Sequence, residues 1–373
     1  MKIVWFSWKD SQHPLAGGAE AVSTQLMSHL VKDGHQVKLI TARYTGSSLE
    51  QTLNGVEIYR TGNRFSVYPK AARLFRRQLS DWPDLIIDEM NTIPFGCALY
   101  SRKRSVLYTY QLARKVWFHQ MPFPISLIGY LLEPVYLWVL SRFYRTVLTE
   151  SDSTRKDLQR FGFKPNAIHV VRVGSELQPL AKLPNKPASQ QLLVLGAIRP
   201  MKQTLEAVKA FELARDNNDQ LSLVIAGDDS DNYAERLKTY VGKSRHNQAI
   251  QILGRVSKER KTSLMQKSAI ILVTSIKEGW GLIITEANGQ GTPAIAYDND
   301  GLRDSIQNGQ TGILTAPKPA ALADAINNLL NNPAKLDQLR INAHQYSQQF
   351  TYQNSYADFT KHLAIKPSKA TRV

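Results

Sequence analysis

Apolar residues along the chain occur in two patterns, short continuous runs and segments in which they recur every three or four positions. The short runs predict buried strands. They lie at residues 2–7, 37–41, 84–87, 105–109, 145–149 and 168–171. Between the first two runs, Val22, Leu26 and Leu30 fall on one face of a helix that ends at Gly34. Strands that alternate with helices predict a parallel sheet covered on both faces.

The same alternation begins again in the second half of the chain. Residues 177–191 contain Pro179, Pro184 and Pro187 with little periodicity, which predicts a linker. Strands are then predicted at 191–196, 221–226, 249–252, 269–274 and 293–297, and helices at about 202–215, 257–267, 282–290, 318–331 and 333–349. We therefore expect domains at residues 1–180 and 181–350, with a helix and tail at 351–373 that packs back towards the first domain. Ligands bind at the carboxyl ends of the strands in such sheets, which predicts a cleft between the domains.

Length and composition fit two soluble domains. The 373 residues are 43% hydrophobic, enough for two cores. The single cysteine, Cys97, cannot form an internal disulfide, and we expect it to be a small buried residue. Glu133 and Pro134 interrupt the most apolar stretch, residues 125–140, and no run reaches the roughly 18 apolar residues of a spanning helix. The N-terminal apolar run is too short for a signal peptide. These features predict a cytoplasmic protein.

The net charge of +16 favours polyanionic partners such as anionic lipid, nucleic acid or phosphorylated substrates. A basic cluster consists of Arg60, Arg64, Lys70, Arg73, Arg76 and Arg77. It is equally compatible with a solvated helix face and with a surface for lipid phosphates at the inner face of a membrane. The aromatic segment 116–144 is expected to be a core helix, although together with the basic cluster it could instead seat the first domain on an anionic membrane.

The most informative segment for chemistry is residues 275–287, Ser-Ile-Lys-Glu-Gly-Trp-Gly-Leu-Ile-Ile-Thr-Glu-Ala. A strand ends there, two glycines permit close backbone approach and a helix begins, which predicts a phosphate site at the helix N-terminus. Glu278 precedes this helix and Glu286 lies about one turn inside it. The two carboxylates can accept hydrogen bonds from hydroxyls at different parts of one extended ligand, such as a ribose and a sugar.

These residues resemble the signature of family 4 glycosyltransferases, in which two glutamates are separated by seven residues. Further likeness lies in Gly-Thr-Pro-Ala at 291–294, Gly-Leu-Arg-Asp-Ser-Ile at 301–306, Gly-Gln-Thr-Gly at 309–312 and Gly-Gly-Ala-Glu at 17–20. The resemblance covers nearly the whole chain. It implies the GT-B fold, with two Rossmann-like doubly wound α/β domains facing a central cleft. It also implies a nucleoside-diphosphate sugar donor, retention at the anomeric carbon, and no metal or other cofactor.

The resemblance also assigns roles to individual residues. Glu278 would contact the transferred sugar and support positive charge at its anomeric carbon, and Glu286 would hold the ribose. The predicted diphosphate site comprises the first-domain glycines Gly17 and Gly18, the backbone of Gly281, Leu282 and Ile283, and the side chains of Lys202 and Arg199. The family's usual arginine falls at Ala197, two positions before Arg199. Gly254, Arg255 and Val256 would line the nucleotide base.

The acceptor side is less clearly marked. Tyr110 occupies the position where many relatives carry a catalytic histidine, and His119 follows nearby on a segment rich in aromatic residues. His13, in the first loop, is a weaker candidate for substrate contact. The leaving diphosphate can itself deprotonate the incoming hydroxyl on the same face, so the absence of this histidine does not exclude activity.

The predicted function is transfer of a mannose- or glucose-type hexose to a saccharide or lipid-linked glycan in cell-surface polysaccharide biosynthesis. A nucleotide-sugar epimerase or hydrolase of the same fold remains an alternative. A catalytically inactive sugar-nucleotide binder is disfavoured because Glu278, Glu286 and Lys202 are all present. A basic protein that binds nucleic acid is also disfavoured, because the sequence has no recognisable nucleic-acid-binding pattern.

Overall fold

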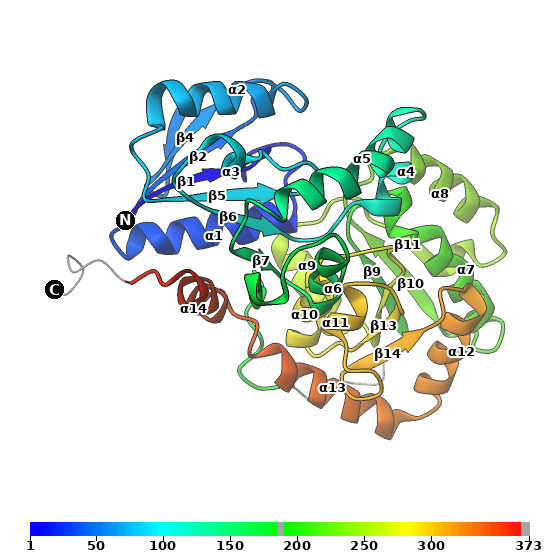
Figure 1. The fold of residues 1–373 in the computed structure, drawn as a ribbon. Coiled ribbons are helices and arrows are strands. Elements are labelled where there is room, and N and C mark those ends of the chain that lie inside the picture. Colours follow the sequence, from blue (N-terminus) through cyan, green and yellow to red (C-terminus); the bar gives the residue numbers. More distant parts are fainter. Residues whose placement is uncertain (185–189, 367–373) are drawn as a thin grey trace. The chain divides into compact units, whose positions relative to one another are not determined.

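The computed structural model describes residues 1–184 and 190–366, which form two α/β units (Figure 1). The first unit contains residues 1–174 and the segment that begins at Thr351, and the second is Ser175–Phe350. The boundary therefore lies between Gly174 and Ser175 rather than after residue 180. Residues 185–189 of the expected linker lie outside the described part of the chain.

The first unit is built on an eight-stranded sheet with the order β3-β4-β2-β1-β5-β6-β7-β8. The strands are β1 (Lys2–Phe6), β2 (Gln36–Thr41), β3 (Glu50–Leu53), β4 (Val56–Arg60), β5 (Leu85–Met90), β6 (Arg104–Thr109), β7 (Val147–Thr149) and β8 (Ile168–Val170). All neighbours are parallel except β3 and β4, which form an antiparallel hairpin at one edge. This hairpin was not predicted, because β3 is polar and carries no apolar run.

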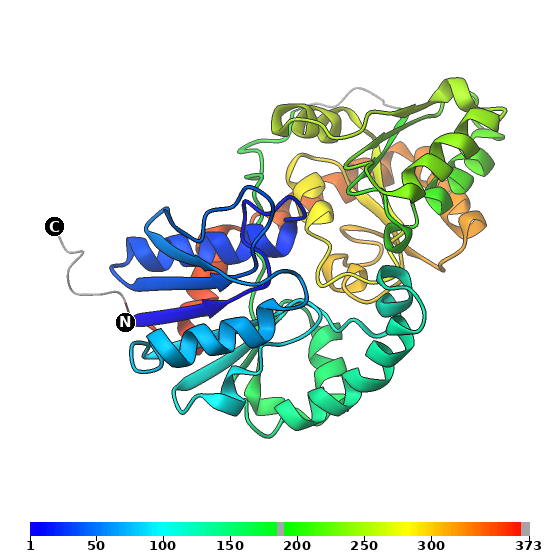
Figure 2. The same ribbon diagram turned by 90° about the horizontal axis from the view of Figure 1, so that it is seen from above.

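Helices cover both faces of this sheet (Figure 2). They are α1 (Gly18–Lys32), α2 (Val67–Leu74) with a π-helical continuation (Phe75–Leu79), α3 (Cys97–Tyr100), α4 (Trp117–Gln120), α5 (Ile125–Leu140), α6 (Asp152–Arg160) and α14 (Tyr352–Leu363). Phe6 of β1 packs against Phe75 and Phe95 in one buried cluster. Cys97 is fully buried in the same cluster, as expected for a small core residue.

The last helix, α14, packs on the first unit. The ring of Phe359 stacks on Trp5 of β1 with 5.8 Å between centroids. The guanidinium of Arg172 donates two hydrogen bonds to Asp358, at 2.6 and 2.9 Å. These contacts bring the end of the described chain back to its first strand.

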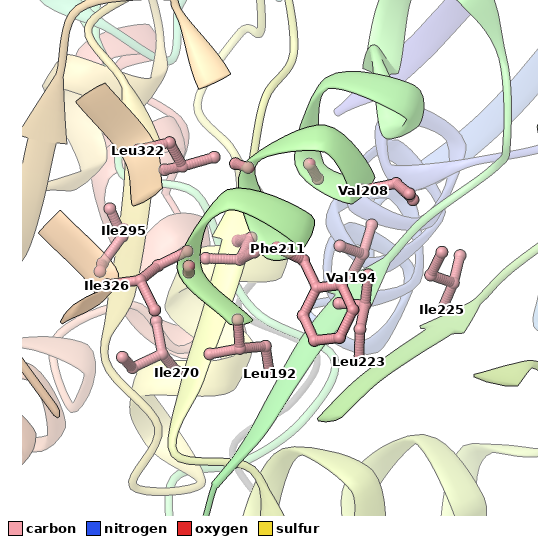
Figure 3. Close-up of a cluster of buried hydrophobic side chains, with 14 of the residues drawn as sticks. Leu192, Val194, Val208, Phe211, Leu223, Ile225, Ile270, Ile295, Leu322 and Ile326 are labelled. Atoms are coloured by element: carbon pink, nitrogen blue, oxygen red, sulfur yellow. The ribbon is translucent and has the colours of Figure 1, made fainter. Parts of the chain in front are cut away.

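The second unit contains a six-stranded, entirely parallel sheet with the order β11-β10-β9-β12-β13-β14. Its strands are β9 (Gln191–Leu195), β10 (Ser222–Ala226), β11 (Ile250–Ile252), β12 (Ile270–Val273), β13 (Ala294–Tyr297) and β14 (Gly312–Thr315). Its helices are α7 (Thr204–Arg215), α8 (Asn232–Lys243), α9 (Lys258–Lys267), α10 (Leu282–Gly289), α11 (Leu302–Ser305), α12 (Pro319–Leu330) and α13 (Pro333–Ser347). Phe211 of α7 lies in the core between Leu192 and Leu223, and Ile326 of α12 packs near Ile270 (Figure 3). Two doubly wound α/β units confirm the predicted fold class.

One member of the basic cluster, Arg60, is not at the surface. Arg60 lies at the end of β4, and its side chain is buried in an ion pair with Asp10 at 2.7 Å. An arginine can be buried in this way because Asp10, Gln12 and Gln51 accept hydrogen bonds from its guanidinium. The other cluster members are exposed before, along and after α2: Arg64, Lys70, Arg73, Arg76 and Arg77. Arg60 therefore belongs to the interior rather than to a lipid-facing surface.

The expectation of a core helix within residues 116–144 is wrong for much of that segment. Helix α5 buries its polar residues Ser126 and Glu133, whereas Leu131 and Trp138 are more than half exposed. The carboxylate of Glu133 accepts hydrogen bonds from the backbone N–H groups of Ala113 and Arg114. These polar contacts and the buried side chains of Leu137 and Leu140 together hold the helix against the unit. Among the described residues, no helix is both long and apolar enough to cross a membrane.

Candidate functional site in the second unit

Two loops at the carboxyl ends of adjacent strands are tied together in the second unit. One follows β9, and the other joins β12 to α10. The hydroxyl of Thr274 donates to the carbonyl oxygens of Lys202 and Gln203, at 2.9 and 3.0 Å. The N–H of Ile276 donates to the Met201 carbonyl at 2.9 Å. This contact set fixes the loop that carries Lys202 against the loop that carries Glu278.

Lys202 and Glu278, both predicted site residues, meet in an ion pair. Lys202 Nζ lies 2.5 Å from Glu278 Oε1, and both side chains are partly exposed. A small cavity of about 20 Å³ adjoins the pair and is also lined by Gly196, Ala197 and Thr274. The cation and the carboxylate therefore stand together at the carboxyl edge of the sheet, where such folds bind ligands.

The glycine before α10 has the backbone conformation that its position requires. Gly281 is the N-cap of α10, with a φ of +91° that favours glycine. Leu282 and Ile283 form the first turn of α10, where backbone N–H groups have no partner within the helix. The predicted phosphate-binding backbone is thus a helix N-terminus. It follows directly after the loop that holds Glu278.

Glu286 lies on α10 and is almost completely buried. Its Oε2 is 2.6 Å from Nζ of Lys261 on α9. Burial raises the pKa of Glu286, and the charge of Lys261 opposes that rise. Sequence reasoning did not identify Lys261. Its position in a helix of mixed charge gave no signal, because its partner lies on a different element.

The other residues predicted to bind the sugar-nucleotide donor in this unit make fewer contacts within the protein. Arg199 is partly buried just before Lys202, and no partner for its guanidinium is found among residues 1–184 and 190–366. Gly254, with a φ of +64°, accepts a hydrogen bond from the N–H of Gly227 at 2.8 Å through its carbonyl. Arg255 is mostly exposed and lies 3.9 Å from Asp228, while Val256 is partly buried. The Gly254–Val256 strip is therefore a surface turn with one fixed backbone contact.

In the first unit, Gly17 and Gly18 are exposed at the start of α1. The N–H of Gly17 donates to Glu20 Oε2 at 2.7 Å, and Lys9 Nζ lies 3.2 Å from the other oxygen of that carboxylate. The hydroxyl of Tyr110 donates to the Ala19 carbonyl at 3.1 Å. Tyr110 is buried and braces the beginning of α1, so its hydroxyl is already engaged within the protein.

The two histidines near the expected acceptor side have different surroundings. His119 is exposed on α4. The ring of His13 lies between those of Trp8 and Tyr44, with centroids 5.5 and 5.4 Å away. Partial burial lowers the pKa of His13, and the nearby charge of Lys9 adds to that effect. His13 is therefore biased towards its neutral form.

Two buried carboxyl groups near Tyr110 were also missed by sequence reasoning. Glu89 of β5 accepts hydrogen bonds from Trp5 Nε1 at 2.6 Å and from the Ser7 hydroxyl at 3.1 Å. Glu150 accepts one from the Tyr108 hydroxyl at 3.3 Å. Burial raises the pKa of each to about 8, with a further contribution at Glu89 from the charge of Glu20. Each is thus a protonated core group at neutral pH.

Comparison with known families accounts for both units. Residues 16–178 match the model described as Glycosyltransferase Family 4, and residues 180–346 match the model described as Glycosyl transferases group 1. The chain belongs to the family 4 glycosyltransferases. This confirms the resemblance that the glutamate signature indicated. The two matches meet close to the boundary between the structural units of this family 4 chain.

Individual relatives agree with this assignment. The family 4 chain is 26% identical over 229 residues to D-inositol 3-phosphate glycosyltransferase from Rhodococcus jostii (strain RHA1), covering 57% of this chain and 50% of the relative. It therefore spans about half the length of this curated relative. Sucrose-phosphate synthase from Thermosynechococcus elongatus has a similar structure, with a TM-score of 0.77 and 19% sequence identity. The match covers 97% of this chain and 98% of that structure. The structure of Anabaena Alr3699/HepE in complex with UDP and glucose is also similar, with a TM-score of 0.73 and 18% sequence identity. The match covers 98% of this chain and 99% of that structure. These structures support the GT-B fold.

Proposed function

We propose that this chain transfers a mannose- or glucose-type hexose from a nucleoside-diphosphate sugar, with retention of anomeric configuration. The acceptor would be a saccharide or a lipid-linked glycan of cell-surface polysaccharide biosynthesis. The observation that carries the proposal is the ion pair between Lys202 and Glu278 beside the N-terminus of α10. One group suits an anionic diphosphate, and the other suits a sugar that develops positive charge. Family membership and a similar structure solved with UDP and glucose support the donor class.

The donor would replace contacts that the protein now makes with itself. Its diphosphate would lie against the N–H groups of Leu282 and Ile283 and attract Lys202 away from Glu278. Glu278 would then be free to accept hydrogen bonds from the transferred sugar. The ribose hydroxyls would reach Glu286, whose buried carboxyl group already pairs with Nζ of Lys261. Each proposed donor contact thus has a polar group already in place.

In the proposed reaction, the acceptor hydroxyl oxygen forms a bond to the anomeric carbon on the face from which the diphosphate departs. The bond between that carbon and the phosphate oxygen breaks, and its electron pair stays with the diphosphate. The hydroxyl proton passes to the leaving diphosphate oxygen. Glu278 would stabilise the positive charge of the anomeric centre, while Lys202 and Arg199 would stabilise the leaving group. This scheme needs no metal, so turnover should persist in EDTA.

The test combines a binding measurement with an activity measurement. Thermal-shift assays with nucleoside diphosphates and their sugars should show that one matched set raises the melting temperature. Glu278→Ala should then lower sugar transfer about 10²- to 10³-fold while the donor still binds. Lys202→Ala should mainly weaken diphosphate binding. Glu235→Ala, on the exposed side of α8, is the matched control and should leave both measurements unchanged.

Several outcomes would reject the proposal. Wild-type transfer in both Glu278→Ala and Lys202→Ala would remove the site assignment. A chain that no activated sugar stabilises would lose the donor class altogether. Release of nucleotide without a glycoside product would indicate a hydrolase instead, and release of an isomerised sugar would indicate an epimerase.

A further inference from the structure

Helix α5 exposes most of its apolar side chains, although it buries Leu137 and Leu140 against the unit. Its outward side chains are apolar and mostly about half exposed: Ile125, Leu127, Ile128, Leu131, Leu132, Val135 and Trp138. Its polar residues Ser126 and Glu133 are buried against the protein. In water, a helix of this kind gains nothing by exposing its apolar side. The arrangement therefore indicates that something apolar covers α5.

Neighbouring segments extend this apolar face. Phe118 of α4 and Phe123 of the following turn are exposed, with Phe123 reaching 78%. Phe143 is also exposed just after α5. We call Phe118, Phe123, Phe143 and the seven outward residues of α5 the α4–α5 face. Exposed large apolar side chains are thus concentrated in residues 118–143, unlike the scattered apolar residues of an ordinary protein surface.

The polar contacts beneath α5 show that this orientation is built into the unit. Glu133 accepts hydrogen bonds from Trp117 Nε1 at 3.1 Å and from two backbone N–H groups of the 113–114 turn. The hydroxyl of Tyr136 donates to the Thr92 carbonyl at 2.8 Å. Rotating α5 to bury Leu131 and Leu132 would break these contacts and would also expose Leu137. The apolar side therefore cannot turn inward at low cost.

The charges around the α4–α5 face identify its partner. Between Lys115 and Glu150, the only acidic residue is Glu133, which is buried. The exposed cations Lys115, Arg142 and Arg145 flank the apolar stripe in the sequence. The guanidinium carbon of Arg142 lies 3.3 Å from the centroid of the Trp138 ring, so a cation accompanies the aromatic group. An apolar stripe bordered by Trp and Arg suits the headgroup region of an anionic bilayer.

We propose that the α4–α5 face inserts into the surface of an anionic lipid bilayer, with α5 lying in the membrane plane. A second copy of the chain is the competing occupant. A symmetric dimer through this face would place its cations close to their own equivalents, whereas anionic headgroups would neutralise them. The proposal concerns the first unit alone and does not depend on the donor chemistry of the second. It does not draw on the basic cluster at residues 60–77, in which Arg60 is buried and the other five members are exposed.

The test is co-sedimentation of the full chain with vesicles of phosphatidylcholine, with and without phosphatidylglycerol. Wild-type protein should bind the anionic vesicles, and Leu131→Gln with Val135→Gln should lower the partition coefficient at least about tenfold. The control pair is Leu49→Gln with Leu213→Gln, which changes equally apolar exposed residues elsewhere and should bind as wild type. Lys115→Glu with Arg145→Glu should weaken binding to anionic vesicles more than binding to neutral ones.

Three results would overturn the proposal. The first is that wild-type protein stays in solution when it is mixed with anionic vesicles. The second is that Leu131→Gln with Val135→Gln leaves vesicle binding intact. The third is that the wild-type protein is a dimer and that the same two substitutions dissociate it. A thermal-shift measurement with nucleotide on each variant separates this proposal from the proposed function. Variants that lose vesicle binding should keep the wild-type response to nucleotide, and a protein that binds vesicles but no nucleotide would refute only the proposed function.

Discussion

At the scale of single residues, the core of the first unit contains two carboxyl groups with raised pKa values, Glu89 and Glu150. Glu89 and Glu150 are fully buried, and the hydrogen bonds that they accept do not compensate for the loss of water around a charge. Because burial raises their pKa values from 4.5 to about 8, both groups hold protons in the folded state at neutral pH. In the unfolded chain the same groups would be ionised.

This difference predicts a loss of stability at alkaline pH. A carboxyl group whose pKa is higher in the folded state stabilises the fold most at low pH, and that contribution falls as pH rises from about 4.5 through about 8. Glu89→Gln removes one such group and keeps one oxygen, which can accept from Trp5 Nε1, while the amide nitrogen replaces the oxygen that faces the Ser7 hydroxyl and can donate to it. The melting temperature of Glu89→Gln should therefore fall less than that of wild type between about pH 6 and pH 9. An equal fall in the two proteins would contradict the assignment, and Glu57→Gln, on the surface of β4, serves as the control.

At the scale of elements, the site depends on loops that pass unusually close to one another. Gly301, the residue before α11, has a φ of +82° and lies beside the Glu278 backbone. A Cβ atom at this position would stand 2.1 Å from the Glu278 carbonyl oxygen, well inside contact distance. Only glycine allows the loop before α11 to support the loop that carries Glu278.

Gly301→Ala is therefore expected to weaken the site by displacing Glu278. The strained φ and the forced backbone shift should cost roughly 1–3 kcal/mol of unfolding free energy, and nucleotide binding should weaken as well. Gly242→Ala is the matched control, because Gly242 lies within α8 with no atom within 4 Å of the added methyl group and should be neutral or slightly stabilising. Denaturant unfolding and nucleotide titration measure the two effects. Unchanged binding in Gly301→Ala would show that the Glu278 loop does not need this support.

The sequence pattern predicted the elements with strong apolar periodicity. It did not predict features that are set by contacts with other segments of the chain. The runs that became β1, β2, β5 and β6 were found because central strands of a parallel sheet are buried on both faces. The polar edge hairpin of β3 and β4 was missed, and α5 was placed in the core because its apolar content is high. Composition reports how apolar a helix is, but the buried contacts of Glu133 decide which side faces outward.

The candidate site shows the same limit. The glycines and glutamates of residues 278–286 form a linear motif that can be recognised from its spacing, whereas the ion pair between Glu278 and Lys202 was not predicted. The ion pairs of Lys261 and Arg60 could not be predicted from the sequence, because the acidic partner of each residue lies on another element. A lone basic residue in a sequence looks the same whether it is solvated or paired in the interior.

At the scale of the whole molecule, the two units have separate hydrophobic cores. One cluster of the first unit surrounds Phe6 and Phe75, and one cluster of the second surrounds Phe211. The chain passes from the first unit to the second and returns with α14, so the first unit is completed only by the end of the described chain. Domains with their own cores can unfold as separate cooperative units.

We therefore expect two thermal transitions in the full chain that respond to different perturbations. A nucleoside diphosphate at about 100 times its dissociation constant should stabilise the second unit by about 2.7 kcal/mol and raise one transition selectively. Phe359→Ala, which removes the ring stacked on Trp5, should destabilise the other unit by about 3–5 kcal/mol and so identify its transition as that of the first unit. Lys361→Ala on the exposed side of α14 is the control. Differential scanning calorimetry measures both shifts, and a single transition that moves with both changes would show that the two units unfold as one.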